Sequence, residues 1–341
     1  MMNSGERETL SEANVHECVG SRGAACSAAA CTKLGVFPAD CPGWCEEAAP
    51  PAVVQVRGHM PQTGDTLPGG FSLARQLGEG GMGRVFASSN AQGHPVAVKV
   101  ISPRAARTSE GVSRFCAEAR ALARVDHPNV VRLLDHRETA PWPFFVTDLV
   151  QGDDLGALLA NVEGVGADVP EALEILEGLF AGVAAIHSAG IVHLDLKPAN
   201  VLVDRERRVR ICDFGLARPC APSCRYPLGQ CAGTPGYIAP EVALGEEVAP
   251  RRAADVYALG VIGYELLTGE RVNASSARAS TSSLLTTAAT SRASVRSIDG
   301  SIREIVGGLL LAAMSIEPRH RPSASTMRAV VRATRRRLRF L

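Results

Sequence analysis

Apolar and polar side chains alternate through residues 71–77, the pattern of a strand that buries one face. Four later segments also have the apolar character of strands, at 84–88, 95–101, 130–134 and 144–149. Between the third and fourth of these five segments, apolar side chains recur at helical spacing over residues 109–125. The pattern therefore predicts a small lobe with a five-stranded antiparallel sheet and one helix.

After Gly152 the apolar spacing becomes mainly helical, in four segments: 171–189, 254–268, 301–315 and 322–337. We therefore expect an α+β protein with two lobes, the first built on the sheet and the second mainly helical. A join near residues 148–152 would leave a cleft between the lobes, a common place for a ligand.

Composition indicates where ordered structure should begin and end. Residues 1–68 are rich in Ala, Gly and Pro, hold five of the ten cysteines and show no regular period, so we expect a low-complexity, disordered extension. The first lobe then covers 69–150 and the second 151–337. Within the second lobe, residues 273–297 contain 12 Ser or Thr in 25 positions and should form a flexible surface insertion. Residues 332–341 form a basic tail, expected to be the solvated end of the last helix.

Charge and hydropathy exclude several classes of protein. The net charge of +1 gives no general attraction to nucleic acid. No run approaches the 18 apolar residues of a membrane span, and the first ten residues lack the apolar core of an export signal. We therefore expect a cytoplasmic protein with reduced thiols, because disulfides belong mainly to exported proteins.

Three glycines, Gly78, Gly80 and Gly83, lie between the first two predicted strands. Glycine lets backbone amides approach phosphate oxygens without a Cβ atom in the way. The same spacing occurs in dinucleotide-binding turns, but a helix follows there, whereas here Val85 lies in a strand. The pattern favours a phosphate-binding loop between two strands.

Lysine is rare in this chain: of 36 basic residues only Lys33, Lys99 and Lys197 are Lys. An indifferent basic position would be expected to hold Arg, so the two lysines within motifs indicate a need for a compact ammonium group. Lys99 lies in a predicted strand, and Glu118 lies in the helix that follows. A solvated lysine and a surface acid would explain each residue alone, but an ion pair explains the two together better.

Residues 193–200, together with Asp213, have the composition of a phosphoryl-transfer site. The carboxylate of Asp195 can orient a hydroxyl nucleophile, and Lys197 can meet the phosphoryl group. Asn200 and Asp213 supply amide and carboxylate oxygens that can hold Mg²⁺ against the phosphates of ATP. These residues predict transfer of phosphate from ATP to a hydroxyl group.

In this order and spacing the motifs resemble those of protein kinases, and residues 233–241 resemble the end of a kinase activation segment. The resemblance covers roughly residues 70–335 and points to the bacterial eukaryotic-like, or Hanks-type, serine/threonine protein kinases. The sequence Asp-Leu-Lys-Pro that begins at Asp195 is of the Ser/Thr type. The resemblance implies ATP and Mg²⁺ as cofactors, with Mn²⁺ as an alternative metal, and protein substrates of unknown identity.

The resemblance also assigns residues to the nucleotide. It makes Asp195 the catalytic base, supported by Lys197, and it makes Glu118 the partner of the phosphate-binding Lys99. The residues expected at ATP are Gly78, Gly80, Gly83, Val85, Ala97, Lys99, Thr147, Asp148, Val150, Asp154 and Leu202. The adenine would be enclosed by Val85, Ala97 and Leu202, with Thr147 at the back of its pocket. Asp148 and Val150 would offer backbone groups to the base. Asp154 would meet the ribose. Ordinary core packing would also explain the apolar members, and the two interpretations are compatible.

Further residues would support the site or the protein substrate. The residues assigned to structural support are His193, Phe214, Asp255 and Arg321. Asp255 would anchor the catalytic loop, and Arg321 would pair with Glu241. Thr234 would line the substrate site near Asp195.

Leu194 stands where many kinases have an arginine that pairs with a phosphorylated activation loop. The loop itself, residues 216–232, contains one Ser, one Tyr and no Thr, which also argues against ordinary activation by phosphorylation. Three cysteines in this loop raise the hypothesis of a thiol switch, or of a metal shared with Cys41 and Cys45: Cys220, Cys224 and Cys231. Three unrelated cysteines are the preferred interpretation, because their spacing is not typical of zinc sites.

Two other functions remain open. Leu194 and the unusual loop would also suit a pseudokinase that binds ATP without turnover, although the complete set of catalytic and metal-binding side chains argues against it. A small-molecule phosphotransferase is disfavoured by residues 233–241, which resemble a platform for a protein substrate. The sequence predicts neither the activation trigger, nor the oligomeric state, nor the role of residues 1–68.

Overall fold

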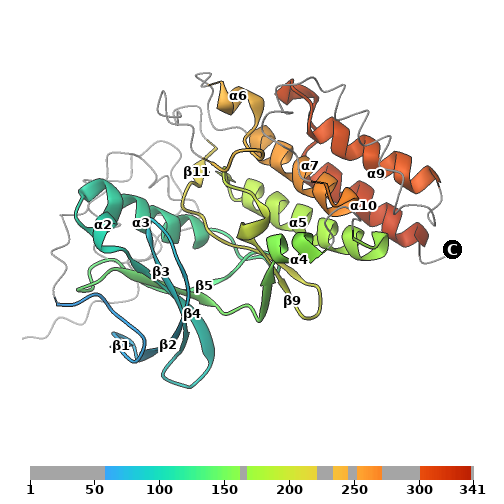
Figure 1. Ribbon diagram of the computed structural model, residues 1–341. Coiled ribbons are helices and arrows are strands. Elements are labelled where there is room, and N and C mark those ends of the chain that lie inside the picture. Colours follow the sequence, from blue (N-terminus) through green and yellow to red (C-terminus); the bar gives the residue numbers. More distant parts are fainter. Residues whose placement is uncertain (1–57, 162–166, 221–232, 245–251, 271–299, 339–341) are drawn as a thin grey trace, which may run out of the picture. The chain divides into compact units, whose positions relative to one another are not determined.

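The computed structural model describes residues 58–161, 167–220, 233–244, 252–270 and 300–338, except for the side chains of 300–303. All of them belong to one structural unit, residues 51–341. In Figure 1 the main sheet lies in the part coloured blue to green, and helices make up most of the part coloured yellow to red. The predicted α+β class, with a sheet first and mainly helices afterwards, is confirmed.

An antiparallel sheet of six strands forms the first part, in the order β1-β2-β3-β4-β6-β5. The strands are β1 (Thr66–Leu67), β2 (Phe71–Glu79), β3 (Gly83–Ser89), β4 (Pro95–Ile101), β5 (Leu133–Arg137) and β6 (Phe144–Asp148). Side chains alternate between the two faces of a strand. In β4, Val98 and Val100 are buried in the core, so Ala97 and Lys99 lie on the opposite face.

The sheet has one strand more than the sequence pattern predicts, and order begins before Phe71. Strand β1 is only two residues long, too short to give a periodic signal, and it pairs Leu67 with Phe71. The intervening Gly69 and Gly70 have positive φ angles of 92° and 80°, which glycine adopts without a steric penalty. Leu67 is buried, so the end of the segment expected to be disordered belongs to the core.

The fourth predicted strand is displaced along the chain. Strand β5 begins at Leu133, three residues after the start of the apolar run at Val130. Val130 instead forms an isolated parallel bridge with Ile211, and the amide of Val131 donates to the Ile211 carbonyl at 3.0 Å. The apolar run therefore joins two distant segments rather than extending the sheet.

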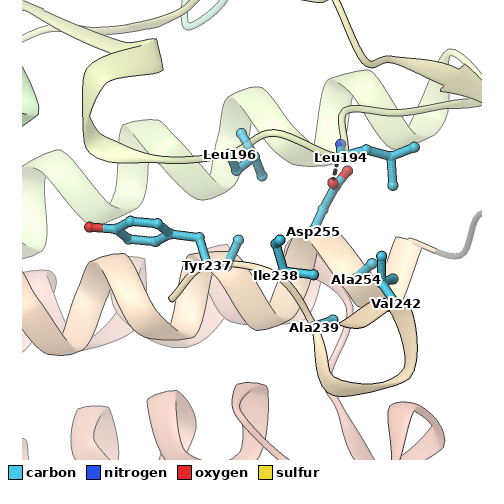
Figure 2. A pocket seen from close by; sticks show the side chains of 9 residues that line it. Leu194, Leu196, Tyr237, Ile238, Ala239, Val242, Ala254 and Asp255 are labelled. Carbon is cyan, nitrogen blue, oxygen red and sulfur yellow. Dashed lines mark hydrogen bonds between the residues drawn. The ribbon is translucent and has the colours of Figure 1, made fainter. Parts of the chain in front are cut away.

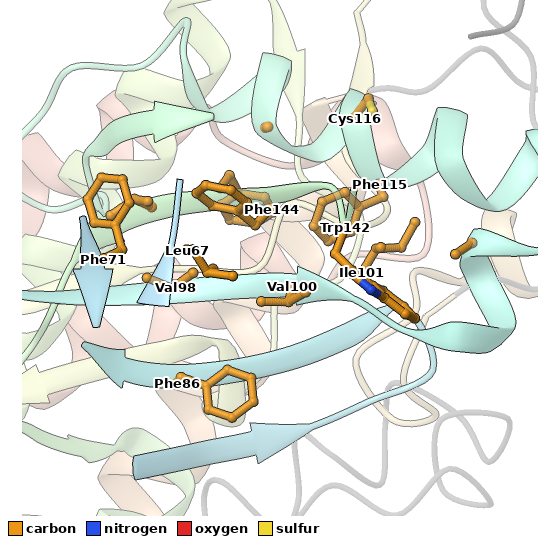
Figure 3. Packing of buried hydrophobic residues seen from close by; sticks show 14 of the residues in the cluster. Leu67, Phe71, Phe86, Val98, Val100, Ile101, Phe115, Cys116, Trp142 and Phe144 are labelled. Carbon is orange, nitrogen blue, oxygen red and sulfur yellow. The ribbon is translucent and has the colours of Figure 1, made fainter. Parts of the chain in front are cut away.

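Two helices lie beside the sheet where one was predicted: α2 (Pro103–Ala106) and α3 (Ser109–Leu122). Helix α2 is a single turn, too short for an apolar period. Helix α3 packs its apolar face on the core, to which it contributes Phe115 and Cys116 (Figure 3). The ring centroid of Phe115 lies 5.3 Å from that of Phe145 in β6. This packing brings the buried Glu118 of α3 towards the sheet.

The second part is built around α5, which lies at the centre of the helical core. The helices are α4 (Leu155–Asn161), α5 (Val169–Ser188), α6 (Pro240–Ala243), α7 (Arg252–Thr268), α9 (Gly300–Ala313) and α10 (Ala324–Leu338). Leu173, Leu176 and Leu179 of α5 are completely buried. Helices α7 and α10 pack against α5, and α9 packs against α7. The four long predicted helices are confirmed to within a few residues, whereas α4 and α6 are too short for the pattern to predict.

Short strands and turns hold the loops between these helices. They are β7 (Gly152–Asp154), β8 (Ile191–Val192), β9 (Val201–Asp204), β10 (Val209–Ile211) and β11 (Arg218–Pro219), with 3₁₀ turns at Pro198–Asn200 and Pro318–His320. They form two small sheets, β10-β9-β7 and β11-β8. The segment 193–200 lies between β8 and β9, and Asp213 follows β10, so paired strands fix both ends of these loops.

Over the described ranges, none of the helices combines the length and the apolar stretch that a bilayer crossing requires.

Candidate active site

Asp195 is the most highly connected side chain of the loop after β8. Its Oδ2 atom accepts a hydrogen bond from Lys197 Nζ at 2.8 Å and one from Asn200 Nδ2 at 3.1 Å. Its Oδ1 atom accepts from the Thr234 hydroxyl at 3.1 Å. The structure thus brings together four predicted residues from two separate motifs, and it fixes the direction of one carboxylate.

Asp255 of α7 anchors the backbone of this loop from below. Its side chain is completely buried and accepts from the amides of His193 and Leu194, each at 2.8 Å, and from His187 Nε2 at 2.8 Å. Burial raises the pKa of Asp255, but the hydrogen bond and charge of His187 and the nearby His193 outweigh it, so the pKa lies below its ordinary value. The carboxylate is therefore ionised, as three donors require.

Leu194 has a left-handed backbone and an apolar environment. Its φ angle is +68°, costly for a residue other than glycine, and the bond from its amide to Asp255 helps to hold it there. The side chain packs against an apolar cluster that includes Val242 of α6 and Ala254 of α7 (Figure 2). A cavity of about 20 Å³ lies beside it, also lined by Ile238. Among the described residues, the neighbours of Leu194 are thus apolar side chains together with Asp255, which also lines the cavity.

Lys99 and Glu118 form an ion pair between β4 and α3. The Lys99 Nζ atom lies 2.5 Å from Glu118 Oε1 and 3.5 Å from Asp213 Oδ1. Burial lowers the pKa of Lys99, but the charges of Glu118 and Asp213 outweigh it and hold the pKa above its ordinary value. The ammonium group therefore stays charged between two carboxylates that come from distant segments.

Asp213 lies at the edge of this charged group. Its backbone is left-handed, with φ at +62°, and its Oδ1 atom accepts from the Gly215 amide at 3.2 Å. Burial raises its pKa, but the charge of Lys99 and the Gly215 amide outweigh it, so the pKa lies below its ordinary value. The side chain is 44% exposed, which leaves an ionised oxygen accessible to a cation.

Phe214 points away from Asp213 into the core. It is buried, and its ring centroid lies 4.9 Å from that of His193. His193 Nε2 lies 3.2 Å from the Cys212 carbonyl oxygen, so the segment around Asp213 is joined to the loop around Asp195. These contacts set the relative positions of the two loops.

The predicted glycine loop forms the turn between β2 and β3. The Gly80 amide donates to the Gly83 carbonyl at 2.9 Å and closes the turn. A Cβ atom at Gly83 would lie 2.5 Å from the Val100 carbonyl oxygen, so packing within the protein requires this glycine. A Cβ atom at Gly78 or Gly80 would meet nothing within 4 Å. These two glycines leave open space over the turn, as a closely approaching ligand would need.

The residues expected at the adenine and ribose lie in two sheets. In the main sheet, Ala97 of β4 pairs with Thr147 of β6, and Val85 pairs with Lys99. In the small sheet, Leu202 of β9 pairs with Asp154 of β7. Cross-strand pairing therefore sets the spacing of the residues within each group.

The last residue of β6, Asp148, has its backbone donor already in use. The Asp148 amide donates to the Arg132 carbonyl at 3.1 Å, while the Asp148 carbonyl accepts from the Thr147 hydroxyl at 3.3 Å. The amide of the last residue of β6 is therefore already paired within the protein.

Glu241 and Arg321 form a buried, bidentate ion pair between α6 and the segment before α10. The two bonds measure 2.7 and 2.8 Å, and Arg321 also donates to the carbonyls of Ala253, Ser315 and Ile316. Such a fork is specific to arginine. It fixes the end of the segment 233–241 to the helical core.

Several residues that support the site gave no clear signal in the sequence. His187 lies near the end of a helical pattern, and its bond to Asp255 depends on tertiary packing alone. The same is true of Tyr237, whose hydroxyl donates to the buried Glu265 at 2.6 Å. Ser102, which contacts the glycine loop, would have been recognisable only as a helix cap before Pro103.

The cysteine hypothesis lies mostly outside the described residues, which exclude Cys224, Cys231, Cys41 and Cys45. Cys220 is exposed, with a free thiol. Within the described part of the chain, no three His, Cys, Asp or Glu side chains come together as a metal site. The proposed insertion at 273–297 is likewise outside the described residues.

Comparison with known proteins gives a consistent family match. The sequence profile of the family described as protein kinase domain matches residues 71–330. Serine/threonine-protein kinase PknA of Mycobacterium tuberculosis is 38% identical over 217 residues, which cover 62% of this chain and 49% of the relative. Serine/threonine-protein kinase Pkn1 of Myxococcus xanthus is 40% identical over 207 residues, 59% of this chain and 29% of the relative. The chain thus matches about half, or less, of the length of these curated relatives.

Proposed function

Because this chain belongs to the protein kinase domain family, we propose that it is a protein serine/threonine kinase of the bacterial Hanks type. It would transfer the γ-phosphoryl group of ATP to Ser or Thr hydroxyls of protein substrates, in signal transduction. The observation that carries this proposal is the carboxylate of Asp195, which is held by Lys197, Asn200 and Thr234. A carboxylate with a fixed direction beside a threonine hydroxyl suits the orientation of another hydroxyl.

In the proposed reaction Asp195 orients the substrate hydroxyl and accepts its proton. A bond forms between the hydroxyl oxygen and the γ-phosphorus, and the bond between that phosphorus and the β,γ-bridging oxygen breaks. Lys197 Nζ lies next to the same carboxylate, so its charge can stabilise the negative oxygens of the transferred group. The products are ADP and a phosphorylated protein.

Family membership implies ATP and a divalent metal ion, and the residues present fit both. Asp213 offers an ionised, partly exposed oxygen. Asn200 uses its Nδ2 group towards the Asp195 carbonyl at 2.8 Å, which leaves its carbonyl oxygen for a cation. Oxygen ligands that are few and supplemented by phosphates and waters suit Mg²⁺. We propose Mg²⁺ as the usual metal, with Mn²⁺ as a substitute that neutralises phosphate charge in the same way.

The nucleotide would bind against the exposed face of β4. Lys99, held charged by Glu118 and Asp213, suits the α- and β-phosphates. The open space over Gly78 and Gly80 suits the remaining phosphate oxygens. With the nucleotide in this place, the paired residues of β4, β6, β7 and β9 would contact the adenine and the ribose. Residues 69–150 would then be the nucleotide lobe, and 151–337 the lobe that holds the substrate and catalytic loop.

We further propose that activity does not require phosphorylation of residues 216–232. The apolar contacts of Leu194 with the cluster around Val242 support this, since they join the catalytic loop to the substrate-side segment without a phosphate. Residues 1–68 and the insertion are left without a proposed role, and a cytoplasmic location stays a prediction.

The experiment that tests the function compares autophosphorylation of the wild type with that of Asp195→Asn, using labelled ATP and Mg²⁺ in reducing buffer. We expect label on Ser or Thr of the wild type and a loss of about 10³-fold or more in the variant, because the carboxylate is lost from the reacting centre. Binding of ATP without label on either protein would establish a pseudokinase instead. Label on small molecules, but on no protein, would establish a small-molecule phosphotransferase.

A further inference from the structure

The tip of the glycine loop, residues Gly80, Gly81 and Met82, is fastened to Ser102 at the end of β4. The Ser102 hydroxyl donates to the Gly81 carbonyl at 2.8 Å. The Ser102 amide donates to the Met82 carbonyl at 2.9 Å. The Met82 side chain also packs on the core of the sheet. Two successive peptide groups of the tip are thus held by one residue.

These bonds fix the direction of an amide as well as of the carbonyls. The Gly81–Met82 peptide is trans, so its C=O and N–H groups point in opposite directions. A Gly81 carbonyl directed at Ser102 therefore directs the Met82 amide away from Ser102. Among the residues that the structure describes, the amides of Gly81 and Met82 have no acceptor. Unsatisfied amides in a fixed direction are suited to an anion.

Ser102 is itself rigidly placed. It is 8% exposed, and its Oγ atom accepts from the Ala105 amide at 3.2 Å as the N-cap of α2. Helix α2 in turn lies directly against α3, because a Cβ atom at Gly111 would be 2.2 Å from the Ala105 carbonyl oxygen. Since α3 carries Glu118, the same support holds the loop tip and the partner of Lys99.

We propose that Ser102 is a positioning residue for the nucleotide, which orients the Met82 amide towards a phosphate group of ATP. The proposal rests on the proposed function and names a residue that acts on the phosphates without touching them. It predicts a defect specific to the phosphates, because the residues expected at the adenine lie outside the loop tip, in β3, β4 and β9 and in and after β6.

The test measures the affinities of ATP and adenosine by calorimetry, together with KM for ATP and kcat, in four variants. Ser102→Ala removes the hydroxyl. Ser102→Gly also removes it, but glycine is a nearly adequate N-cap, so the helix is less perturbed. Ser102→Thr keeps the hydroxyl. The matched control is Thr108→Ala, which removes the cap of α3, where Thr108 Oγ1 accepts from the Gly111 amide at 3.0 Å without contacting the loop.

We expect Ser102→Ala and Ser102→Gly to weaken ATP binding about three- to tenfold, the size of one lost hydrogen bond, and to raise KM for ATP similarly. Adenosine affinity should change less than twofold, Ser102→Thr should restore ATP binding, and Thr108→Ala should resemble the wild type. Hydrogen exchange over residues 78–84 without nucleotide should be faster in the first two variants only.

Two results would overturn the proposal. One is an equal loss of ATP and adenosine affinity in both hydroxyl-free variants, which would indicate general loosening of the lobe. The other is ATP affinity in Ser102→Gly equal to that of the wild type. In both cases a wild type that binds and turns over ATP would leave the proposed function intact. A wild type that does not bind ATP would contradict both the role proposed for Ser102 and the proposed function.

Discussion

At the scale of single residues, buried charges that accept several hydrogen bonds hold the site together. Asp255 accepts three, of which two come from consecutive backbone amides of the catalytic loop. A carboxylate is suited to this because it has acceptor sites only, whereas an amide would turn donors towards donors. The shape of the loop therefore depends on one charge beneath it.

We predict that Asp255→Asn destabilises the protein by about 2–4 kcal/mol at neutral pH, because one donor at least is left without an acceptor. Urea unfolding would measure this, with Asp153→Asn, at an exposed position of β7, as the control. The control should change the free energy of unfolding by less than about 0.5 kcal/mol.

The same prediction has a defined pH dependence. The pKa of Asp255 in the folded protein lies below its ordinary value of 3.8, so its stabilisation is complete above pH 3.8 and is lost only as the pH falls through the lowered folded value. The difference between wild type and variant should persist at about pH 5 and shrink as the pH falls below 3.8. A difference that is already lost at about pH 5 would contradict the assignment.

At the scale of elements, apolar packing joins the catalytic loop to the segment that ends in α6. Leu194 packs beside Val242 of α6 and Ala254 of α7, and Glu241 fixes α6 through Arg321. The loop and the segment thus share one apolar cluster, and the ion pair fixes the segment to the helical core.

We predict that Leu194→Arg lowers kcat/KM for a peptide substrate by at least about tenfold, because the longer, charged side chain would disrupt the packing of Leu194 against this apolar cluster. Leu194→Met, which conserves volume, should stay within about threefold of the wild type. Affinity for ATP should be unchanged in both, since Leu194 does not belong to the nucleotide site. Wild type treated with phosphatase should keep its activity. Higher activity of phosphorylated Leu194→Arg than of wild type would contradict the apolar link.

At the scale of the whole molecule, the segment that follows α3 joins the sheet side of the chain to the helical core. The Asn129 side chain donates to the Val209 carbonyl at 2.9 Å, and the Ile211 amide donates to the Asn129 carbonyl at 2.9 Å. Helix α5 approaches this junction closely, because a Cβ atom at Gly182 would lie 2.7 Å from the Asn129 carbonyl oxygen. Since Asp213 is two residues beyond Ile211, the junction also positions the metal-binding candidate.

We predict that Gly182→Ala destabilises the protein by about 1–3 kcal/mol and lowers kcat, since the added methyl group would push α5 from the junction. Gly308→Ala in α9 is the matched control. Its Cβ atom would meet nothing within 4 Å, so helix propensity alone should stabilise the protein by about 0.5–1 kcal/mol. Chemical denaturation measures the change in the free energy of unfolding of each variant, and a kinase assay measures kcat. A stabilising effect of the same size in both would show that Gly182 is not packed as described.

The sequence by itself determined the long elements and the family. Long helices such as α5 and α7, and strands such as β4, were predictable because apolar periods over many residues reflect the geometry of a single element. The motifs around Asp195 and Asp213 were recognisable, and the family they indicated is confirmed, because residue types at short spacing carry that information. The individual site roles remain predictions.

Tertiary structure alone decided how these pieces meet. The two-residue β1, the one-turn α2 and the use of Val130 as a bridge gave no periodic signal, since each depends on a partner far away in the chain. The same reason hides the apolar site of Leu194 and the bonds from Ser102 to the glycine loop. Local sequence sets which residues are available, whereas their distances and surroundings follow only when distant segments pack together.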